Sequence, residues 1–373
     1  MTISLALMGN SKSSARKKNI PSISIQCVKC VKHVMPPTPP KQEPSESSLL
    51  PQGWTRANFI PKFYGGSVNV VALSHDNKYL AAATEENGVC VWNINTGEEL
   101  MALNEMAACK GMCWQNSANV LYYSRGNNIA RWDLEKSATP THILLTPFVD
   151  NTIYNMAMAP DDSYLLLSTF KELYKYSAYS ANSANSADGT MESTKLVVAA
   201  TYIPSICCSP DSKIITAVCA YQQGGPTYVS MWDATSLKQV YKGGENRLDR
   251  LHEVAWNHEG TQYATVSEAI TIWAWPENRK LRSIHPPIIG YDAFSPRSIC
   301  WSPDDKMLAT GAYGSHVCLV DRQYGPQADN IVYKVGQHRS TVTTIDWRGD
   351  MIATGSYDAQ IILWAPSAPP YAP

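Results

Sequence analysis

Three potential zinc ligands stand close together near the start of the chain, in the pattern Cys27-x-x-Cys30-x-x-His33. Thiolate and imidazole are groups that bind zinc in proteins, but a structural zinc site needs four ligands. The segment offers only three at this spacing, so we interpret them as incidental side chains. A haem-attachment motif is excluded as well, because it requires a histidine directly after the second cysteine. No metal site is therefore predicted.

Motifs for catalysis and cofactor binding are absent from the sequence. It contains no phosphate-binding Walker loop, no glycine-rich dinucleotide fingerprint, no nucleophile elbow and no HExxH pair. The paired glycines Gly224–Gly225 are the ordinary composition of a hairpin turn. We therefore predict a protein that is not an enzyme and that needs no cofactor.

The composition favours many short strands joined by turns. The chain has 373 residues, of which 44% are hydrophobic and 17% are charged, and it contains 20 Tyr and 11 Trp but only 5 Phe. The net charge is −1, and lysine and arginine are concentrated in the first 50 residues, so the remainder is mildly acidic. A sequence-independent grip on nucleic acid needs a basic face. We expect no direct nucleic-acid binding, sequence-specific binding included.

Cysteine usage and apolar runs indicate the compartment. Ten cysteines in a chain of this size do not form a disulfide scaffold, and several fall at apolar positions of expected strands. No apolar run approaches the roughly 20 residues of a membrane span. We expect a reducing environment, in the cytoplasm, the nucleus or both, and no membrane association.

The two ends of the chain differ from its middle. Residues 1–53 are rich in Ser, Pro and Lys and include MPPTPPKQEPSESS, at Met35–Ser48. Such a segment cannot bury enough apolar surface to offset its ordering entropy, so a disordered N-terminal tail is predicted. Residues 367–373 are predicted to be a proline-rich C-terminal tail. The ordered domain is expected to be 54–366.

The middle of the chain is repetitive. Each unit begins with three apolar residues at relative positions 0, +3 and +5, followed by a polar turn, a second apolar run and a third run. Intervals of 41–50 residues indicate a repeat architecture, in which neighbouring units bury each other's apolar faces. The seven units begin at Val68, Cys109, Ile153, Ile203, Leu251, Pro296 and Val342.

The turn and the third run of each unit are also marked. The turn reads SPDS at Ser209 and SPDD at Ser302, where proline fixes φ and aspartate can bond to its own backbone. The third run ends in an aromatic residue in six units, and it reads Trp-Asp at Trp132–Asp133 and Trp232–Asp233.

Seven such units in register resemble the WD40 repeat family, over roughly residues 54–366. The resemblance implies an all-β fold, a seven-bladed WD40-type β-propeller in which each unit is a four-stranded antiparallel blade. Closing the blades into a ring leaves only short, protected edges. The proline-rich residues 365–373 cannot extend a sheet. Family members take the last outer strand from the N-terminal side, so residues 54–60 (WTRANFI) are expected to close blade seven.

The last unit also matches a side-chain network that is common in the family. The resemblance implies a buried hydrogen-bond network of His338, Thr354, Asp358 and Trp364. A histidine and an aspartate near a hydroxyl also make up a catalytic triad. We interpret this set as structural, since a fully satisfied network rigidifies a blade. The other six units lack the histidine, so apolar packing is expected to stabilise them.

Partner binding is expected on the narrow face of the ring, as is usual in the family. The loops that gather there precede the first strand of each blade or join its second and third strands. The residues that map to them are rich in tyrosine and arginine, which anchor interfaces. They are Lys110, Arg125, Tyr154, Lys171, Tyr221, Arg250, Glu268, Arg297, Tyr313, Arg339 and Tyr357.

Two connections are longer than the others. The stretch His285–Arg297 lies on the narrow face and either docks a partner or folds over its own blade. Its apolar residues are Ile288, Ile289, Tyr291 and Phe294. The stretch Ser177–Lys195, on the opposite face, is interpreted from its Ser/Ala/Asn composition as a flexible loop without a partner.

The function predicted from these features is a non-catalytic scaffold or adaptor that binds proteins or peptides, as part of a multi-protein complex. A substrate receptor of a cullin-type ubiquitin ligase is one alternative, although the Trp-Asp-x-Arg sequence of such receptors is missing at Trp132 and Trp232. An activator like those of the anaphase-promoting complex is another, but the chain ends Tyr-Ala-Pro instead of Ile-Arg. A chromatin or histone-peptide reader is a third, and it would need an acidic pocket at the channel mouth.

Overall fold

The computed structural model of the chain describes residues 54–56, 66–84, 88–103, 109–137, 139–146, 152–177, 190–196, 198, 202–221, 226–246, 250–285, 296–312, 315–322 and 332–366. The chain divides into a unit Met1–Pro44 and a unit Ser45–Pro373, and every described residue belongs to the second. The predicted tails 1–53 and 367–373 and the side chains at 27, 30 and 33 lie outside the described residues.

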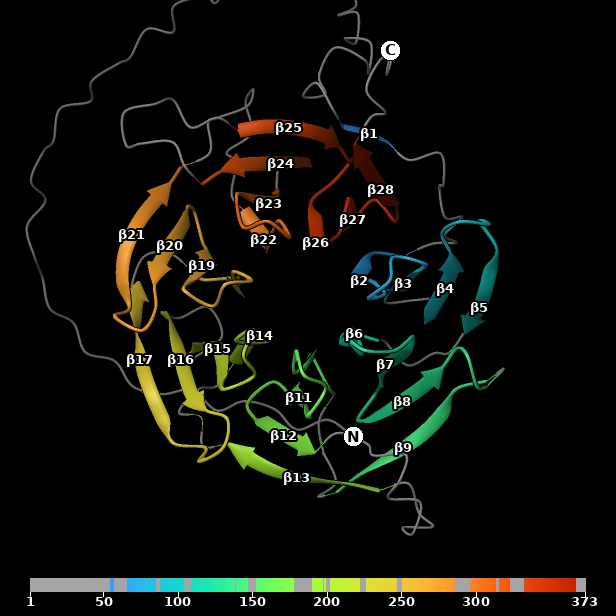
Figure 1. The fold of residues 1–373 in the computed structure, drawn as a ribbon, viewed down its shortest axis with the longest axis horizontal. Helices are drawn as coiled ribbons and strands as arrows, with labels where there is room; N and C mark the ends of the chain where they lie inside the picture. Colours follow the sequence, from blue (N-terminus) through green and yellow to red (C-terminus); the bar gives the residue numbers. More distant parts are fainter. Residues whose placement is uncertain are drawn as a thin grey trace, which may run out of the picture. The chain divides into compact units, whose positions relative to one another are not determined.

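The described residues form seven blades around a central channel, as the sequence predicts (Figure 1). They contain strands β1–β28 and no helix, and in this part of the chain no helix is therefore long and apolar enough to span a membrane. Within each blade the strands run from the innermost to the outermost in an antiparallel meander.

The strands of the first four blades follow one another along the chain. Blade 1 contains β2 (Val68–Leu73), β3 (Tyr79–Thr84), β4 (Val89–Asn93) and β5 (Glu99–Leu103). Blade 2 contains β6 (Met112–Trp114), β7 (Val120–Arg125), β8 (Asn128–Asp133) and β9 (Thr141–Thr146). Blade 3 contains β10 (Asn155–Met158), β11 (Tyr164–Ser168), β12 (Leu173–Ser177) and β13 (Thr190–Leu196). Blade 4 contains β14 (Tyr202–Cys208), β15 (Ile214–Ala220), β16 (Thr227–Asp233) and β17 (Gln239–Asn246).

The last three blades complete the ring. Blade 5 contains β18 (Glu253–Trp256), β19 (Gln262–Val266), β20 (Ile270–Ala274) and β21 (Arg279–Ile284). Blade 6 contains β22 (Pro296–Trp301), β23 (Met307–Ala312), β24 (His316–Asp321) and β25 (Val332–Gln337). Blade 7 contains β26 (Val342–Arg348), β27 (Met351–Ser356), β28 (Ile361–Pro366) and, as its outermost strand, β1 (Trp54–Arg56).

Strand β1 joins the two ends of the domain. It pairs antiparallel with β28, with Trp54 opposite Pro366 and Arg56 opposite Trp364 (Figure 1). The described strand is shorter than the seven residues expected, since residues 57–60 lie outside the described part. The outer edge of blade 7 is therefore covered by residues that come before blade 1 in the chain, which links the first and last blades.

The interpretation of Ser177–Lys195 as a flexible loop without a partner is wrong at both ends of the stretch. Ser177 ends β12, and residues 190–195 belong to β13, which pairs antiparallel with β12 and parallel with β9 of blade 2. The polar composition suits an outer strand, because Thr194 and Lys195 are exposed while Leu196 is buried. Blades 2 and 3 thereby share one continuous sheet.

The core lies between the blades, where the repeated apolar residues pack. In blades 2 and 6 the third residue of the trio is a tryptophan that points toward the preceding blade. Trp114 Nε1 donates a hydrogen bond to Ala72 O at 3.0 Å, and Trp301 Nε1 donates to Ala255 O at 3.1 Å. Each tryptophan is buried, so its N–H finds a partner across the blade junction.

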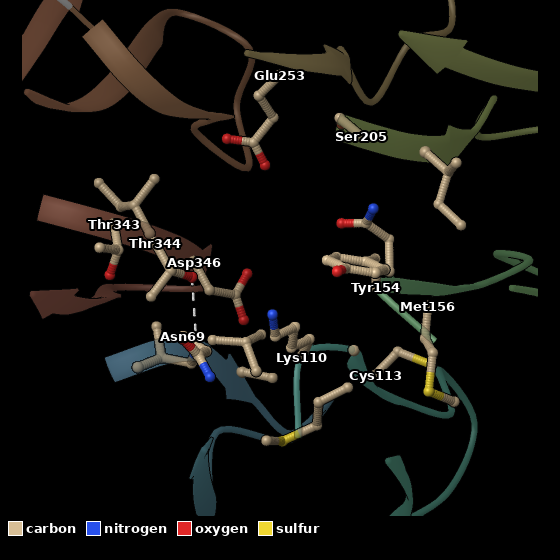
Figure 2. Close-up of a pocket in the computed structure, with 18 of the residues that line it drawn as sticks. Asn69, Lys110, Cys113, Tyr154, Met156, Ser205, Glu253, Thr343, Thr344 and Asp346 are labelled. Atoms are coloured by element: carbon tan, nitrogen blue, oxygen red, sulfur yellow. Dashed lines mark hydrogen bonds between the residues drawn. The ribbon is translucent and has the colours of Figure 1, made fainter. Parts of the chain in front are cut away.

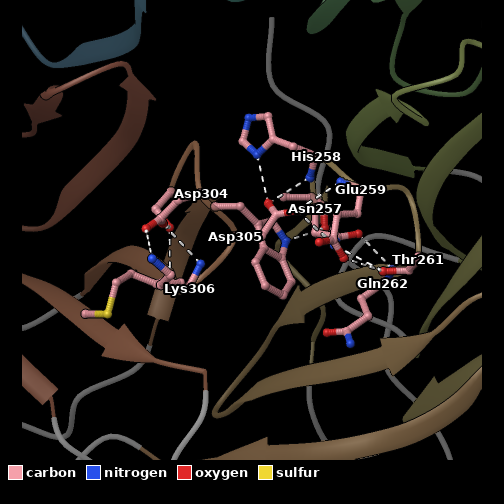
Figure 3. Close-up of polar contacts among 12 residues, drawn as sticks. Asn257, His258, Glu259, Thr261, Gln262, Asp304, Asp305 and Lys306 are labelled. Atoms are coloured by element: carbon pink, nitrogen blue, oxygen red, sulfur yellow. Dashed lines mark hydrogen bonds and ion pairs between the residues drawn. The ribbon is translucent and has the colours of Figure 1, made fainter.

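The turn between the first and second strands of several blades holds a residue with left-handed backbone. Its side chain or backbone contacts the preceding blade, and we call this contact the turn clamp. At the junction of blades 5 and 6, Asp305 (φ 57°) accepts hydrogen bonds from the backbone N–H groups of His258, at 2.8 Å, and Glu259, at 2.9 Å (Figure 3). The other turn clamps are made by Asn77, Asp162 and Ser212.

Candidate functional site

The central channel is a cavity of about 490 Å³ that is lined by the inner strands of the ring. Side chains from β18 and β26, and from the residues just before β6 and β10, point into it, among them Lys110, Tyr154, Glu253 and Asp346 (Figure 2). The ends of the channel differ, because the loops before each first strand and between the second and third strands lie at one end only. We call that end the upper face, which is the narrow face of the sequence analysis, and the opposite end the lower face.

Two carboxylates inside the channel hold neighbouring blades together. Glu253 of blade 5 accepts a hydrogen bond from the Ile299 N–H of blade 6 at 2.8 Å, and Asp346 of blade 7 accepts one from the Leu73 N–H of blade 1 at 2.7 Å. Removal of Glu253 from bulk water raises the pKa of its carboxyl to about 8, and the nearby Asp346 contributes in the same direction. At neutral pH, Glu253 is therefore mostly uncharged.

Aromatic rings and cations surround the channel at the upper face. The Phe170 ring lies 5.9 Å from that of Tyr154 and 5.0 Å from that of Tyr202. The Lys110 ammonium sits 4.6 Å from the centre of the Tyr154 ring, on the channel wall. Tyr202 begins β14 of blade 4 and the others lie in loops of blades 2 and 3, so three blades contribute to one aromatic surface.

The opposite side of the channel mouth repeats the combination of a cation and a ring. The Arg297 guanidinium lies 5.6 Å from the centre of the Tyr357 ring, and 45% of Tyr357 is exposed to solvent. His252 lies in the same wall, where burial, Arg297 and Arg250 lower its pKa to about 4. His252 is thus neutral at physiological pH, and the positive charge at this side of the mouth belongs to the arginines.

The four side chains of the blade 7 network are joined by hydrogen bonds. His338 Nε2 lies 2.8 Å from Thr354 Oγ1, His338 Nδ1 lies 3.2 Å from both carboxylate oxygens of Asp358, and Trp364 Nε1 lies 3.0 Å from Thr354 Oγ1. A consistent donor order runs from the Trp364 N–H through the Thr354 hydroxyl to His338, and from the His338 Nδ1–H to Asp358.

The burial and ionisation of this network match a structural role. Burial alone would raise the pKa of Asp358, but the hydrogen bonds from His338 and from the Arg339 N–H outweigh it and lower the pKa to about 2. His338 is 2% exposed. A catalytic histidine and hydroxyl must reach a substrate. Here the Thr354 hydroxyl already accepts a hydrogen bond from the Trp364 N–H.

Comparison with known families agrees with this architecture. The family model for the WD domain, G-beta repeat, matches residues 58–93, 289–321 and 330–365, which correspond to blades 1, 6 and 7. No curated protein matches the chain. The other blades have the same order of four strands. The chain belongs to the WD40-repeat propellers.

A WD40 propeller is generally a scaffold for protein interactions and typically lacks catalytic activity, so the site is best described as a binding surface. Of the side chains predicted on the narrow face, Lys110, Tyr154, Arg297 and Tyr357 line the channel. Others lie at the upper ends of strands or in upper-face loops, away from the channel lining: Arg125, Lys171, Tyr221, Arg250, Glu268 and Arg339. The remaining ones lie outside the described residues: Ile288, Ile289, Tyr291, Phe294 and Tyr313.

Several channel residues of this WD40 propeller were missed by the sequence analysis, which considered loops alone. Phe170 and Tyr202 complete the aromatic surface, and Glu253 and Asp346 line the channel. For Glu253 and Asp346 the signal was present, because they are at relative positions +2 and +4 of their repeats, which alternate with the buried ones at +3 and +5 and so face the channel. Within the described ranges, no three His, Cys, Asp or Glu side chains gather as metal ligands.

Proposed function

We propose that this WD40 propeller is a non-catalytic scaffold that holds a segment of a partner protein over the upper end of its channel. The observation that carries the proposal is the ring of aromatic and cationic side chains at that end. Tyr and Arg are the residues that most often dominate binding energy at protein interfaces. These side chains come from five blades, on strands or on short loops between strands, so little conformational entropy is lost when a partner binds.

The charges at the mouth favour one class of partner segment. Lys110 and Arg297 stand on either side of the channel, each against a tyrosine ring. A segment that presents acidic and aromatic side chains complements them, and electrostatic attraction would also speed its association. A reader of basic histone peptides would need acidic groups at this place. The two carboxylates lie within the channel, and Glu253 is mostly protonated at neutral pH.

The experiment is affinity capture with the full chain as bait, comparing the wild type with a Tyr154→Ala/Tyr357→Ala double variant. We expect recovery of the specifically captured proteins to fall by about tenfold or more, since loss of one interface hot spot costs at least ~2 kcal/mol. The matched control is Leu100→Ala/Val240→Ala, which removes two exposed apolar side chains from outer strands. An unchanged set of captured proteins in the tyrosine variant would rule out this surface.

The stretch 286–294 is a second element of the same proposal. It precedes β22, whose Arg297 lines the channel mouth, so a docking role would extend the upper-face surface. Replacing 286–294 with a Gly/Ser linker of equal length tests it in the same capture experiment. Loss of partners that the tyrosine variant also loses would support one continuous site, and unchanged recovery would assign no docking role to this loop.

A further inference from the structure

A second cavity lies on the lower face, between blades 6 and 7, away from the upper-face surface. Its volume is about 690 Å³, within the usual range for ligand-binding clefts. Its walls come from the first turns of the two blades and from the paired strands β1 and β28. Its lining includes Trp54, Pro303, Met307, Leu319, Trp347 and Asp350. We call this cavity the lower groove.

At the lower groove, blade 7 makes neither the turn clamp nor the tryptophan contact that blade 6 makes toward blade 5. Trp347 occupies the trio position of Trp114 and Trp301, yet its indole N–H donates to Gly349 O of its own blade, at 3.2 Å. The turn position that makes a clamp in blade 6 is occupied here by Gly349, with φ 54° and no side chain. The space between the two turns is thus left open.

The floor of the lower groove is apolar and aromatic. The Trp54 ring meets the Trp347 ring edge to face, with 5.5 Å between the ring centres and an interplanar angle of 90°. Leu319 and Trp347 are buried, whereas Trp54 and Met307 are half-buried and face the opening. In the described part of the chain, the Trp54 indole N–H has no hydrogen-bond acceptor. It can therefore donate to a carbonyl of a bound peptide.

The rim of the lower groove is acidic. Asp350 is exposed and forms no ion pair within the described residues. Asp304, on the opposite wall, accepts a hydrogen bond from Ser302, which lowers the pKa of its carboxyl, and pairs with Lys306 at 3.1 Å. One carboxylate of the rim, that of Asp350, therefore remains available for a positive charge on a ligand.

We propose that the lower groove binds a proline-rich segment of a partner protein that carries a lysine or arginine beside its prolines. Such segments form polyproline II helices, whose rings pack on exposed aromatic side chains and whose carbonyls accept hydrogen bonds from indole N–H groups. Trp54, which packs edge to face on the buried Trp347, supplies the aromatic surface, and Asp350 supplies the complementary charge. This site is independent of the upper-face function, since no residue is shared.

Binding is measured by isothermal titration of the full chain with two synthetic probes. One is a proline decamer with a central arginine, and the other has glutamate at that position. We expect saturable binding of the arginine peptide and weaker binding of the glutamate peptide. An exposed ion pair contributes ~0.2–1 kcal/mol, so the Asp350→Lys variant should lose about two- to fivefold in affinity for the arginine peptide and should prefer the glutamate peptide. Trp54→Ala should abolish binding of both.

A second charge reversal, elsewhere on the lower face, separates the role of Asp350 from a general effect of the added charge on the fold. Glu277→Lys makes the same kind of charge reversal at an exposed position in the turn before β21, on the lower face of blade 5, and should leave the preference unchanged. Three outcomes would overturn the proposal: no saturable binding to the wild type, equal effects of the two charge reversals, or binding only after residues 367–373 are removed. The last would show that the chain's own proline-rich end fills the groove.

Discussion

Blade 6 meets its two neighbours in different ways. Toward blade 5 the junction is polar: Asp305 clamps the turn, Trp301 donates to a backbone carbonyl of blade 5, and the Ile299 N–H donates to Glu253. Toward blade 7 the junction is apolar and depends on close approach. Gly311 and Gly336 of blade 6 leave room for Val342 and Trp364 of blade 7, where a Cβ would overlap with those side chains.

The difference shows that one repeat can be joined to its neighbours by two kinds of contact. Hydrogen bonds at the turn require a side chain at the left-handed position, as at Asp305. At the junction of blades 6 and 7 the turn carries Gly349 and makes no clamp, and the close contact lies at Gly311 and Gly336 of the strands. The polar junction is closed at the lower face, and the apolar junction leaves the lower groove there.

The largest expected effect is at the polar junction. Asp305→Gly retains the backbone conformation but removes a carboxylate that accepts hydrogen bonds from His258, Glu259 and Asn257. We expect the free energy of unfolding to fall by about 2–4 kcal/mol, since buried hydrogen bonds to a charged group contribute ~1.5–3 kcal/mol each and are lost together. Urea unfolding measures it, and Asp350→Ala at the apolar junction should change stability by less than about 0.5 kcal/mol.

The stability lost in Asp305→Gly should depend on pH. Burial alone would raise the pKa of Asp305, but the hydrogen bonds outweigh it, so the folded-state pKa is lowered. A lowered carboxyl pKa stabilises the protein above the ordinary aspartate pKa, and this contribution is lost as the pH falls through the folded-state value. The difference between wild type and Asp305→Gly should therefore be full at pH 6 and shrink toward pH 3. A constant difference would contradict an ionised clamp.

A smaller effect is expected at the apolar junction. In Gly311→Ala the new methyl group would lie 2.7 Å from Val342 Cβ and closer still to one of its methyl groups. Overpacking of this kind costs about 1–3 kcal/mol. The double variant Gly311→Ala/Val342→Ala should recover part of the loss, because the colliding methyl groups are removed. Thermal unfolding of the three variants measures the coupling, and additive losses would show that the two blades are not in close contact here.

The smallest effect is expected from Glu253→Gln, on the channel side of the polar junction. Glutamine keeps an oxygen acceptor for the Ile299 N–H but cannot ionise. The pKa of Glu253 is raised to about 8 in the folded protein, so the wild type loses stability as the pH rises from the ordinary glutamate value toward 8. The variant should match the wild type near pH 4 and melt roughly 2–4 °C higher at pH 8. Equal melting temperatures at pH 8 would contradict the raised pKa.

The periodic features of the fold could be predicted from the sequence, and the contacts between blades could not. The trios starting at Val68 and its counterparts repeat because one buried face recurs in every blade, so spacing alone reveals them. The SPDD sequence predicts a turn, but not that Asp305 adopts a left-handed conformation and bonds to the preceding blade. The contact of Asp305 with the preceding blade depends on the position and angle of that blade, which are fixed only when the ring closes.

The candidate site shows the same division. Loop residues such as Tyr154 and Tyr357 could be assigned to the upper face from their position between strands. Phe170 and Tyr202 were missed because they matter through contacts in space that the sequence does not show: the Phe170 ring lies beside the rings of both Tyr154 and Tyr202. The lower groove was missed for a similar reason, since it results from one indole that turns toward its own strand.

The pairing of β13 with β9 gives the ring seven blades but only six sheets. In repeat proteins each unit can usually open while its neighbours stay folded, because only side chains cross the boundaries. Here a ladder of paired strands crosses the boundary between blades 2 and 3, so these two blades are expected to open or persist as a single cooperative unit. Local opening of this propeller is therefore expected to begin at a blade other than 2 or 3.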